Sequence, residues 1–321
     1  MSYLQNGHQP GFCNGYRVGF AVFPICNTLI QRNLPVFAPP VHTQHFMAQR
    51  ATLLKRQVGK KLIFLTLQDR SGSMQVCLRK DTLEAETLRG LRRTLDVGDF
   101  LGVEGIIWLT RTGEITVDAS DAVILSKALR PLPEKWAGVQ DREICYRRRY
   151  LDLLTNEETR ARFRFRARLV KSMRNFLDDH GFEEVETPVL ETKVSGALAK
   201  PFVSHHNALD MSVTMRIAPE TWLKRLIVGG DERVYEFARC FRNEGMDPSH
   251  LQDFTMLEYY VAYWSYEENM AFTQKLLQHV VQETTGSLTF TPPGSDTPID
   301  ISGDWPRRRM TDLIKEKAGL D

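Results

Sequence analysis

RVYEFARCFRNEGMDPSHLQDFTMLEYYVAY, residues 233–263, decides how we expect the second half of the chain to fold. Side chains of a strand point alternately to opposite sides, so each half of this stretch predicts a strand with charged side chains along one face. Antiparallel pairing across the polar loop between them sets Glu244 opposite Phe254. The same register sets Arg242 opposite Met256. The stretch therefore predicts a two-stranded hairpin.

One face of this hairpin gathers groups that are costly to bury without a partner: Arg242, Glu244, Phe254, Glu258 and Tyr260. An unpaired buried charge costs roughly several kcal/mol, so these groups either pair with one another in a solvated sheet or bind a ligand. In the first alternative, Arg242 forms an ion pair with Glu244 or Glu258. In the second, the arginine binds a phosphate, an aromatic ring stacks on a purine, and carboxylates beside a tyrosine hold an ammonium group. The ligand alternative predicts a nucleotide and an amine.

The composition is that of a soluble chain with room for two or three compact units. It has 321 residues, of which 42% are hydrophobic and 26% are charged. No apolar run approaches the length needed to span a bilayer, so we expect no membrane partner. The front of the chain is basic, because no Asp or Glu occurs before Asp69. A basic front suits contact with phosphate backbones and is equally typical of a solvated face.

Five widely separated cysteines, with no Cys-x-x-Cys pair, indicate reduced thiols in a cytosol-like compartment. Residues 1–42 predict an irregular extension. Its lack of acidic residues is shared by mitochondrial transit peptides, whereas its prolines and its few Ser and Arg are not. We therefore predict a cytoplasmic protein, with a mitochondrial one as the alternative. The adjacent His205 and His206 point opposite ways on a strand, and we predict no metal site within this chain.

Residues 43–130 alternate like short strands and contain three strands, a helix and two further strands. This is the element order of an OB barrel, which presents strands 2 and 3 to single-stranded nucleic acid, and any other small β-barrel is the alternative. On that face Phe64 could stack on a base and Gln75 could read a base edge, although a strand Phe more often packs in a core. Asp81 and Glu84 have the spacing of a capping box before the helix.

Residues 131–160 predict a linker, and residues 161–321 a second domain. The apolar spacing predicts a helix over 161–179, and the pattern after it predicts a strand over 185–190. A later helix opens with a capping box formed by Ser265 and the glutamate three residues on. Single helices between strands joined by hairpins predict an antiparallel α+β domain.

From Gly59 to Asp321 the chain resembles the class II lysyl-tRNA synthetases almost without a gap. The hairpin resembles motif 2 of that class. Matching phrases run along the chain: LQDRSGSMQV, LSKALRPLPEKW, YRRRYLDLL, GFEEVETPVL, KPFVSHHNALDM, RIAPETWLKRLIVGG, FRNEG and FTMLE. The resemblance implies an α+β fold with an N-terminal OB-fold β-barrel that binds the anticodon. An incomplete class II synthetase antiparallel-sheet catalytic domain follows, with motifs 1 and 2 only.

The resemblance implies lysine–tRNA ligase chemistry, in which the lysine carboxylate attacks the α-phosphorus of ATP and the lysyl group then passes to tRNA(Lys), with Mg²⁺ as cofactor. Arg242 is then the catalytic residue, because it would clamp the α-phosphate and the substrate carboxylate. The rest of the implied ATP site is Glu244, His250, Phe254 and Met256. The implied lysine site is Gly196, Glu220, Glu258 and Tyr260. The implied anticodon-binding residues are Phe64, Gln75 and Asp121. Pro188 is expected at the seam of a homodimer formed through motif 1.

Two departures from the family pattern affect these expectations. In the loop, unusual residues stand at four positions: Ser249, Leu251, Gln252 and Asp253. A guanidinium lost at Ser249 and an acid gained at Asp253 predict weaker ATP binding. The family also continues past the equivalent of Asp321, through acidic magnesium ligands and motif 3, so we expect a truncated ligase. The alternatives are a non-catalytic synthetase-like tRNA-binding protein and a dimerisation partner of a full-length synthetase.

Overall fold

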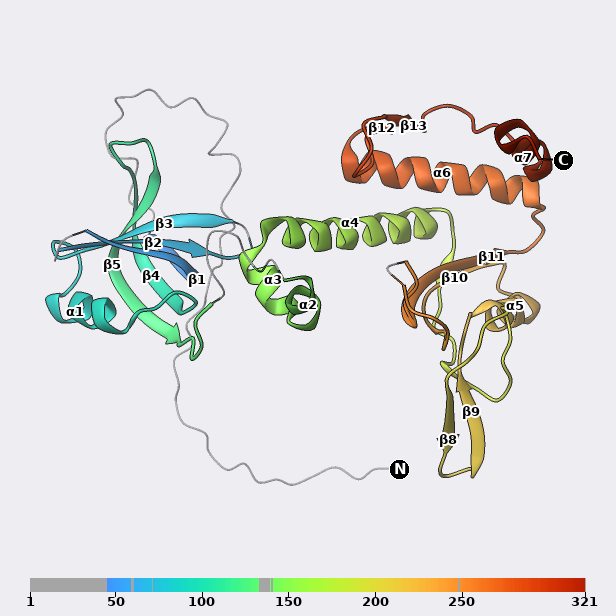
Figure 1. Cartoon of the computed structure of the whole chain (residues 1–321), viewed down its shortest axis with the longest axis horizontal. Helices are drawn as coiled ribbons and strands as arrows, with labels where there is room; N and C mark the ends of the chain where they lie inside the picture. Colours follow the sequence, from blue (N-terminus) through green and yellow to red (C-terminus); the bar gives the residue numbers. More distant parts are fainter. Residues whose placement is uncertain are drawn as a thin grey trace, which may run out of the picture. The chain divides into compact units, whose positions relative to one another are not determined.

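The computed structural model describes residues 45–58, 61–70, 72–132, 139, 141–247 and 249–320. The chain divides into two compact units, the first ending at Asn156 and the second beginning at Glu157 (Figure 1). Each unit has its own cluster of buried hydrophobic side chains. The predicted irregular extension, residues 1–42, lies outside the described residues.

The first unit is built around a five-stranded barrel. Its elements are β1 (His45–Val58), β2 (Leu62–Gln68), β3 (Ser73–Arg79), α1 (Ala85–Thr94), β4 (Phe100–Leu109) and β5 (Ile115–Ser126). The strands pair in the order β1-β2-β3-β5-β4, and β4 pairs with β1, which closes the barrel. β3 and β5 pair in parallel, and the other neighbours are antiparallel. This confirms the OB element order that the sequence predicts.

Alternation along the strands fills the inside of the barrel. Ile63, Leu65 and Leu67 of β2 are buried in the core, and the residues between them are less buried. α1 adds a stripe of buried leucines, as expected from its apolar spacing. The predicted capping box is wrong. Glu84, and not Asp81, directly precedes α1, and its side chain makes no capping hydrogen bond.

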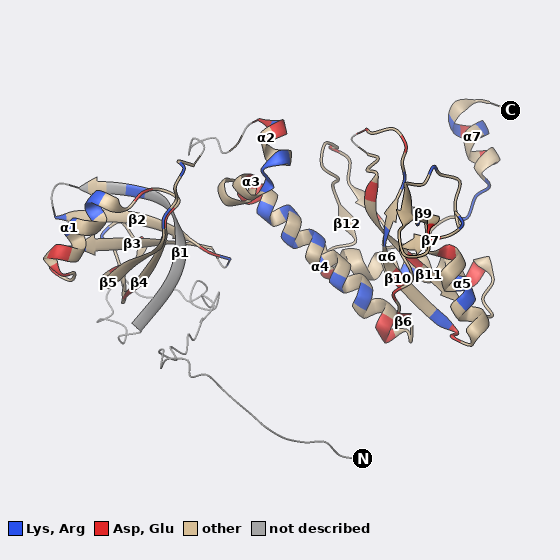
Figure 2. Ribbon diagram, turned by 90° about the horizontal axis from the view of Figure 1, so that it is seen from below, with Lys and Arg blue, Asp and Glu red and all other residues tan. Residues whose placement is uncertain are grey.

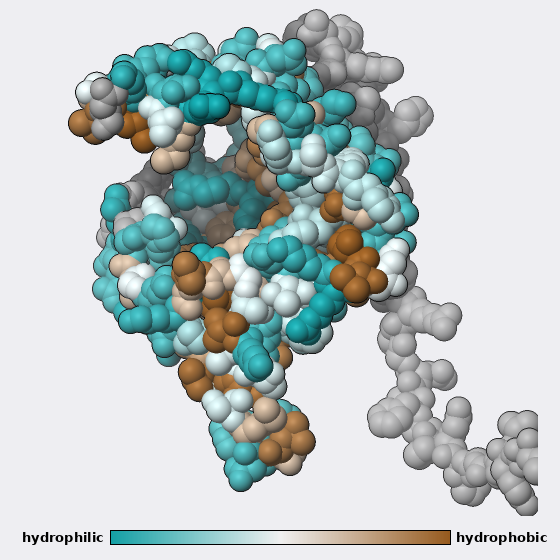
Figure 3. All heavy atoms as spheres, turned by 90° about the vertical axis from the view of Figure 1, so that its right-hand side faces the viewer, coloured by the Kyte–Doolittle hydropathy of each residue, from teal (hydrophilic) through white to brown (hydrophobic). Residues whose placement is uncertain are grey.

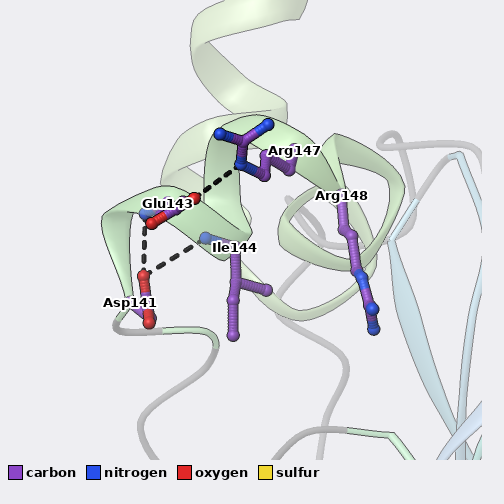
Figure 4. Close-up of a pocket in the computed structure, with 5 residues that line it drawn as sticks. All are labelled: Asp141, Glu143, Ile144, Arg147 and Arg148. Carbon is purple, nitrogen blue, oxygen red and sulfur yellow. Dashed lines mark hydrogen bonds and ion pairs between the residues drawn. The ribbon is translucent and has the colours of Figure 1, made fainter.

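Two short helices, α2 (Arg142–Arg147) and α3 (Arg149–Thr155), lie within the stretch predicted as a linker. Asp141 caps α2, because its carboxylate accepts hydrogen bonds from the backbone N–H groups of Glu143 and Ile144 (Figure 4). A small pocket opens beside this first turn. The boundaries of the linker stay a prediction.

The second unit combines helices with short and long strands. Its elements are α4 (Glu157–Asp179), β6 (Glu183–Glu184), β7 (Leu190–Glu191), β8 (Val203–His206), β9 (Met211–Met215), α5 (Glu220–Gly229), β10 (Arg233–Phe241), β11 (Asp253–Val261), α6 (Tyr266–Thr285), β12 (Thr289–Phe290), β13 (Ile299–Asp300) and α7 (Met310–Ala318). The sheets have the orders β11-β10-β6, β7-β9-β8 and β12-β13. The long pair β10–β11 is antiparallel, as predicted, and β6 adds a short parallel pairing.

Of two sequence predictions at the start of this unit, a helix is confirmed and a strand is wrong. The helix expected over 161–179 is present and begins at Glu157. The strand expected over 185–190 is wrong, because only two-residue strands flank that stretch. Pro188 explains the gap, since proline has no N–H to donate to a sheet ladder. Farther along, the capping box at Ser265 is confirmed.

The β10–β11 hairpin has two different faces. Odd-numbered side chains join the aromatic cluster of α4 and α6: Tyr235, Phe237, Leu257, Tyr259 and Val261. Figure 1 shows α4 and α6 on that side of the hairpin and α5 on the other. The even-numbered side chains therefore face away from the aromatic cluster, toward the side where α5 lies.

The register of the hairpin differs from the predicted one. Cys240, not Glu244, pairs with Phe254, and Ala238, not Arg242, pairs with Met256. β10 ends before Arg242 and Glu244, so both lie in the connecting loop. Alternation fixes which side a residue faces and leaves the pairing partner open, which is why the predicted register failed.

Lys and Arg residues recur along α4, where Figure 2 marks them in blue. On the face of the molecule in Figure 3, hydrophobic side chains form separate patches among hydrophilic ones. Within the described ranges, no helix combines the length and the hydropathy that crossing a bilayer requires.

Candidate functional site

A buried ion pair supports the even-numbered face of the hairpin. Arg216 Nη1 lies 2.7 Å from Glu236 Oε1, and both side chains are almost fully buried. Arg216 also donates to the carbonyl oxygens of Thr187 and Arg239 at 3.0 and 2.8 Å. The Thr187 hydroxyl donates to Glu236 Oε2 at 2.6 Å. The Glu236 charge is therefore satisfied inside the protein, and the network ties β10 to the segment that contains Pro188.

Arg242 lies just beyond β10 and meets Phe254, an aromatic residue that the sequence predicts on the same face of the hairpin. Its guanidinium carbon is 5.1 Å from the centroid of the Phe254 ring. Its Nη2 reaches the Ile217 carbonyl oxygen at 3.5 Å. Its Nε is buried and makes no hydrogen bond within the described residues. This unsatisfied donor is free to bind an anion.

Glu258 supplies an unsatisfied acceptor on the same face. It pairs across the hairpin with Glu236, and its Oε2 is buried without a hydrogen-bond partner in the described part of the chain. Burial raises the pKa of Glu258, and the negative charges of Glu220 and Glu236 add to the rise, while Arg242 and Lys224 oppose it. Glu258 Oε2 thus lacks a hydrogen-bond donor, which an ammonium group would provide.

Glu220 and Tyr260 lie close to Glu258 and already hold an amine of the protein itself. Lys224 Nζ is 2.6 Å from Glu220 Oε1 and 5.7 Å from the centroid of the Tyr260 ring. Burial, followed by the charges of Glu258 and Glu220, raises the pKa of Tyr260 to about 12. A carboxylate and an aromatic ring beside Glu258 therefore already stabilise one ammonium group.

Gly196 lies against the first residue of α5, Glu220. Its φ of +87° lies in the region that favours glycine. A Cβ here would lie 3.1 Å from Glu220 Cβ and 3.2 Å from Ala218 Cβ. A larger residue would therefore push on Glu220, which explains the glycine physically.

The loop after β10 holds two more predicted residues. Asp247 Oδ2 lies 2.6 Å from His250 Nδ1, and Asp247 Oδ1 accepts the backbone N–H of Ser249 at 2.6 Å. This backbone hydrogen bond, more than the one with His250, lowers the pKa of Asp247. Glu244 is not on the strand face as expected, because its Oε1 accepts the Lys200 backbone N–H at 3.2 Å. Both predicted residues are exposed.

Two of the unusual loop residues have structural partners. Asp253 pairs with Arg239 at 2.7 Å on the odd-numbered face of the hairpin. Asp253 therefore points away from the face of Phe254 and Met256, and its expected effect on ATP binding stays a prediction. Gln252 donates to the backbone of the loop, which holds the loop closed.

The predicted anticodon residues all lie on the outside of the barrel. Phe64 and Gln75 are half-buried on neighbouring strands, β2 and β3. Asp121 is exposed farther along β5, where its Oδ1 accepts the Ala122 backbone N–H at 2.8 Å. Pro188, in the second unit, is exposed together with the two residues that follow it. No predicted site residue lines the pocket beside α2, which Figure 4 shows.

Lys224 and the Arg216–Glu236 pair belong to the site but were not predicted from the sequence. Lys224 follows Glu220 by four residues, the helical spacing that brings opposite charges together, so a signal for it was present. Arg216 directly follows β9 and Glu236 lies within β10, with α5 between them in the sequence. No local pattern therefore joins them.

Comparison with known proteins gives two family matches. A family model described as tRNA synthetases class II (D, K and N) matches residues 141–321. A model described as OB-fold nucleic acid binding domain matches residues 50–125.

Similar proteins include lysine–tRNA ligases of three bacteria. The identity is 46% with that of Dehalococcoides mccartyi strain 195, over 88% of this chain and 56% of the relative. It is 48% with that of Carboxydothermus hydrogenoformans, over 84% and 54%. It is 49% with that of Magnetococcus marinus, over 82% and 52%. The chain thus spans little more than half the length of these relatives. Because the first family model covers more than half of the chain and includes the whole hairpin, the chain belongs to the class II tRNA synthetases of the D, K and N family.

Proposed function

We propose that the chain carries the lysine-activating and anticodon-binding part of a lysine–tRNA ligase. The observation that carries this proposal is a pair of buried atoms without partners, Arg242 Nε and Glu258 Oε2, on the side of the hairpin that holds Phe254. Each costs free energy unless a ligand supplies the missing group. A substrate pair with a phosphate and an ammonium group supplies both. The name shared by the relatives supports lysine as that amine.

In this reaction the lysine carboxylate attacks the α-phosphorus of ATP, a new O–P bond forms, and pyrophosphate leaves. Arg242 balances the charge that develops on the phosphate oxygens, and Phe254 stacks on the adenine. Glu258, Glu220 and Tyr260 hold the ammonium group of lysine, which aligns its carboxylate for attack. Positioning and electrostatic stabilisation by these side chains account for the catalysis we propose.

We propose the remaining ATP and lysine contacts from the resemblance to the family, and the membership of the chain in that family supports them. His250, oriented by Asp247, reaches the outer phosphates, and Glu244 contacts the adenine or ribose end. Gly196 leaves room for the substrate backbone. Among the described residues, no group of three or more His, Cys, Asp or Glu side chains could hold a metal ion.

The proposed macromolecular partners are tRNA(Lys) and a second copy of the chain. Phe64, Gln75 and Asp121 on the barrel would meet the anticodon, and Pro188 would lie at the homodimer seam. The free thiols of the described Cys77, Cys145 and Cys240 support a cytoplasmic location. Sedimentation equilibrium tests the dimer, since a monomer at every concentration would contradict it.

Exchange of labelled pyrophosphate into ATP tests the activation step. We expect exchange that depends on lysine, and a fall of about 100-fold or more for Arg242→Ala. Arg239→Ala is the matched control, because Arg239 lies on β10 three residues before Arg242, on the odd-numbered face of the hairpin, and forms an exposed ion pair. Absence of exchange above the blank in the wild-type chain would rule out catalysis by this chain alone.

A second candidate is a synthetase-like tRNA-binding protein or a dimerisation partner of a full-length synthetase. The observation that favours it is the match of residues 50–125 to an OB-fold nucleic acid binding domain, which supports RNA binding independently of the hairpin site. Filter binding of tRNA(Lys) across a salt series tests tRNA binding, since log affinity should fall linearly with log salt. Co-purification with a full-length synthetase tests the partner role.

A further inference from the structure

One row of residues crosses four strands on the outside of the barrel. Thr66 of β2 pairs with Gln75 of β3, Gln75 with Thr116 of β5, and Thr116 with Trp108 of β4. Residues paired directly across a sheet face the same side. Trp108 therefore lies on the same outer surface as Gln75 and as Phe64, which is two residues from Thr66 on β2.

Alternation along β4 confirms that Trp108 points outward. Ile107 packs against the barrel core, so its two neighbours face the other way. Ile106 is 43% exposed and Trp108 39% exposed. Leu109 follows with 63% exposure and has the opposite orientation by alternation. The exposed side chains of Trp108 and Ile106 thus lie next to each other on the outer surface, at the strand β4.

Gln75 is held in a fixed orientation between the two aromatic residues. The Thr116 hydroxyl donates to Gln75 Oε1 at 2.8 Å, although Thr116 itself is fully buried. The N–H groups of Gln75 make no hydrogen bond within the described residues, so they can bind an acceptor. Strands lie about 4.8 Å apart, so Trp108 is roughly 10 Å from Gln75 across the sheet. Phe64 is a diagonal neighbour of Gln75 on the other side, roughly 7–8 Å away.

We propose that Trp108 stacks on an unpaired RNA base, next to the base whose edge Gln75 reads. This inference rests on the proposed function, in which the barrel binds the anticodon loop. A planar base suits this surface, because its face covers the indole and a neighbouring base offers acceptors to Gln75. An apolar protein partner would cover the Gln75 N–H groups without satisfying them. The match of this region to an OB-fold nucleic acid binding domain agrees with an RNA occupant.

Fluorescence anisotropy with a labelled RNA hairpin that carries UUU in its loop tests the proposal on the 321-residue chain. Trp108→Ala should raise Kd by about 5- to 100-fold, which is the usual loss of one base–aromatic stack. Trp108→Phe should restore most of the affinity, because a benzene ring still stacks. Leu109→Ala is the matched control and should bind as the wild type does. Thermal unfolding of each variant checks that the barrel is folded.

Fluorine NMR of the chain labelled with fluorotryptophan gives a second measurement. The resonance that is missing from the Trp108→Phe spectrum identifies Trp108, and it should shift when the hairpin is added and stay in place with a blunt RNA duplex. Wild-type affinity in Trp108→Ala, with weaker binding in Phe64→Ala, would overturn the role of Trp108 and leave the proposed function intact. Equal binding of hairpin and duplex by the wild type would overturn both.

Discussion

Replacement of Arg216 by methionine tests the buried network beneath the candidate site. Arg216→Met leaves the Glu236 carboxylate buried, with the Thr187 hydroxyl as its remaining partner among the contacts described. Removal of one member of a buried ion pair costs about 3–5 kcal/mol, a large share of the roughly 5–15 kcal/mol that stabilises a domain. With a urea dependence of about 2 kcal/mol per molar, the unfolding midpoint of the second unit should fall by about 2 M.

Two further variants make this prediction specific. Arg239→Met removes an ion pair whose members are both about half exposed, and it should cost less than about 1 kcal/mol. Arg216→Met combined with Glu236→Leu removes both buried charges and should recover most of the lost stability. Urea unfolding followed by the fluorescence of Trp222 and Trp264 measures all three variants. If Arg216→Met and Arg239→Met unfold within 1 kcal/mol of each other, roughly the error of such comparisons, the reasoning is refuted.

Three other predictions concern the site itself. Because the folded-state pKa of Glu258 is raised, its ionisation weakens the fold as pH rises above the unfolded value of 4.5. Glu258→Gln should therefore have a higher melting temperature than the wild type at pH values above the raised pKa of Glu258. Its rate of lysine-dependent pyrophosphate exchange should fall by about 10- to 100-fold. Equal melting temperatures of the two proteins from acid to neutral pH would contradict the effect on stability. Gly196→Ala should lower the free energy of unfolding by about 1–2 kcal/mol, because of the positive φ and the close Glu220 Cβ, whereas Gly229→Ala, with open space around it, should not. Ser249→Arg should tighten ATP binding about fivefold in calorimetry relative to Ser249→Ala, and an unchanged Kd would show that the loop position does not meet phosphate.

The barrel and the hairpin could be predicted because both depend on local alternation. The same rule explains why Arg242 meets Phe254 although the predicted register was wrong. Both were assigned to one face by even spacing, and that assignment does not depend on the exact partner. Asp253 has an odd position, so the same alternation places it beside its partner Arg239.

Contacts between distant segments could not be predicted in this way. The contact between Gly196 and Glu220 depends on how the chain between them folds back. The sequence around each residue does not predict this contact. The Arg216–Glu236 pair likewise joins β10 to the residue after β9. The strand expected through Pro188 failed for a local reason, since proline interrupts the ladder of backbone hydrogen bonds.

The division of the hairpin into two faces also guards the folding of the chain. A slip of β11 by one residue would turn Glu258 into the aromatic cluster of α4 and α6, and would move Leu257 to the charged side. The misaligned form would bury the Glu258 carboxylate and would also lose the apolar packing of Leu257. Both changes raise its free energy above that of the native register. The alternation that assembles the binding groups is therefore also a safeguard against misfolding.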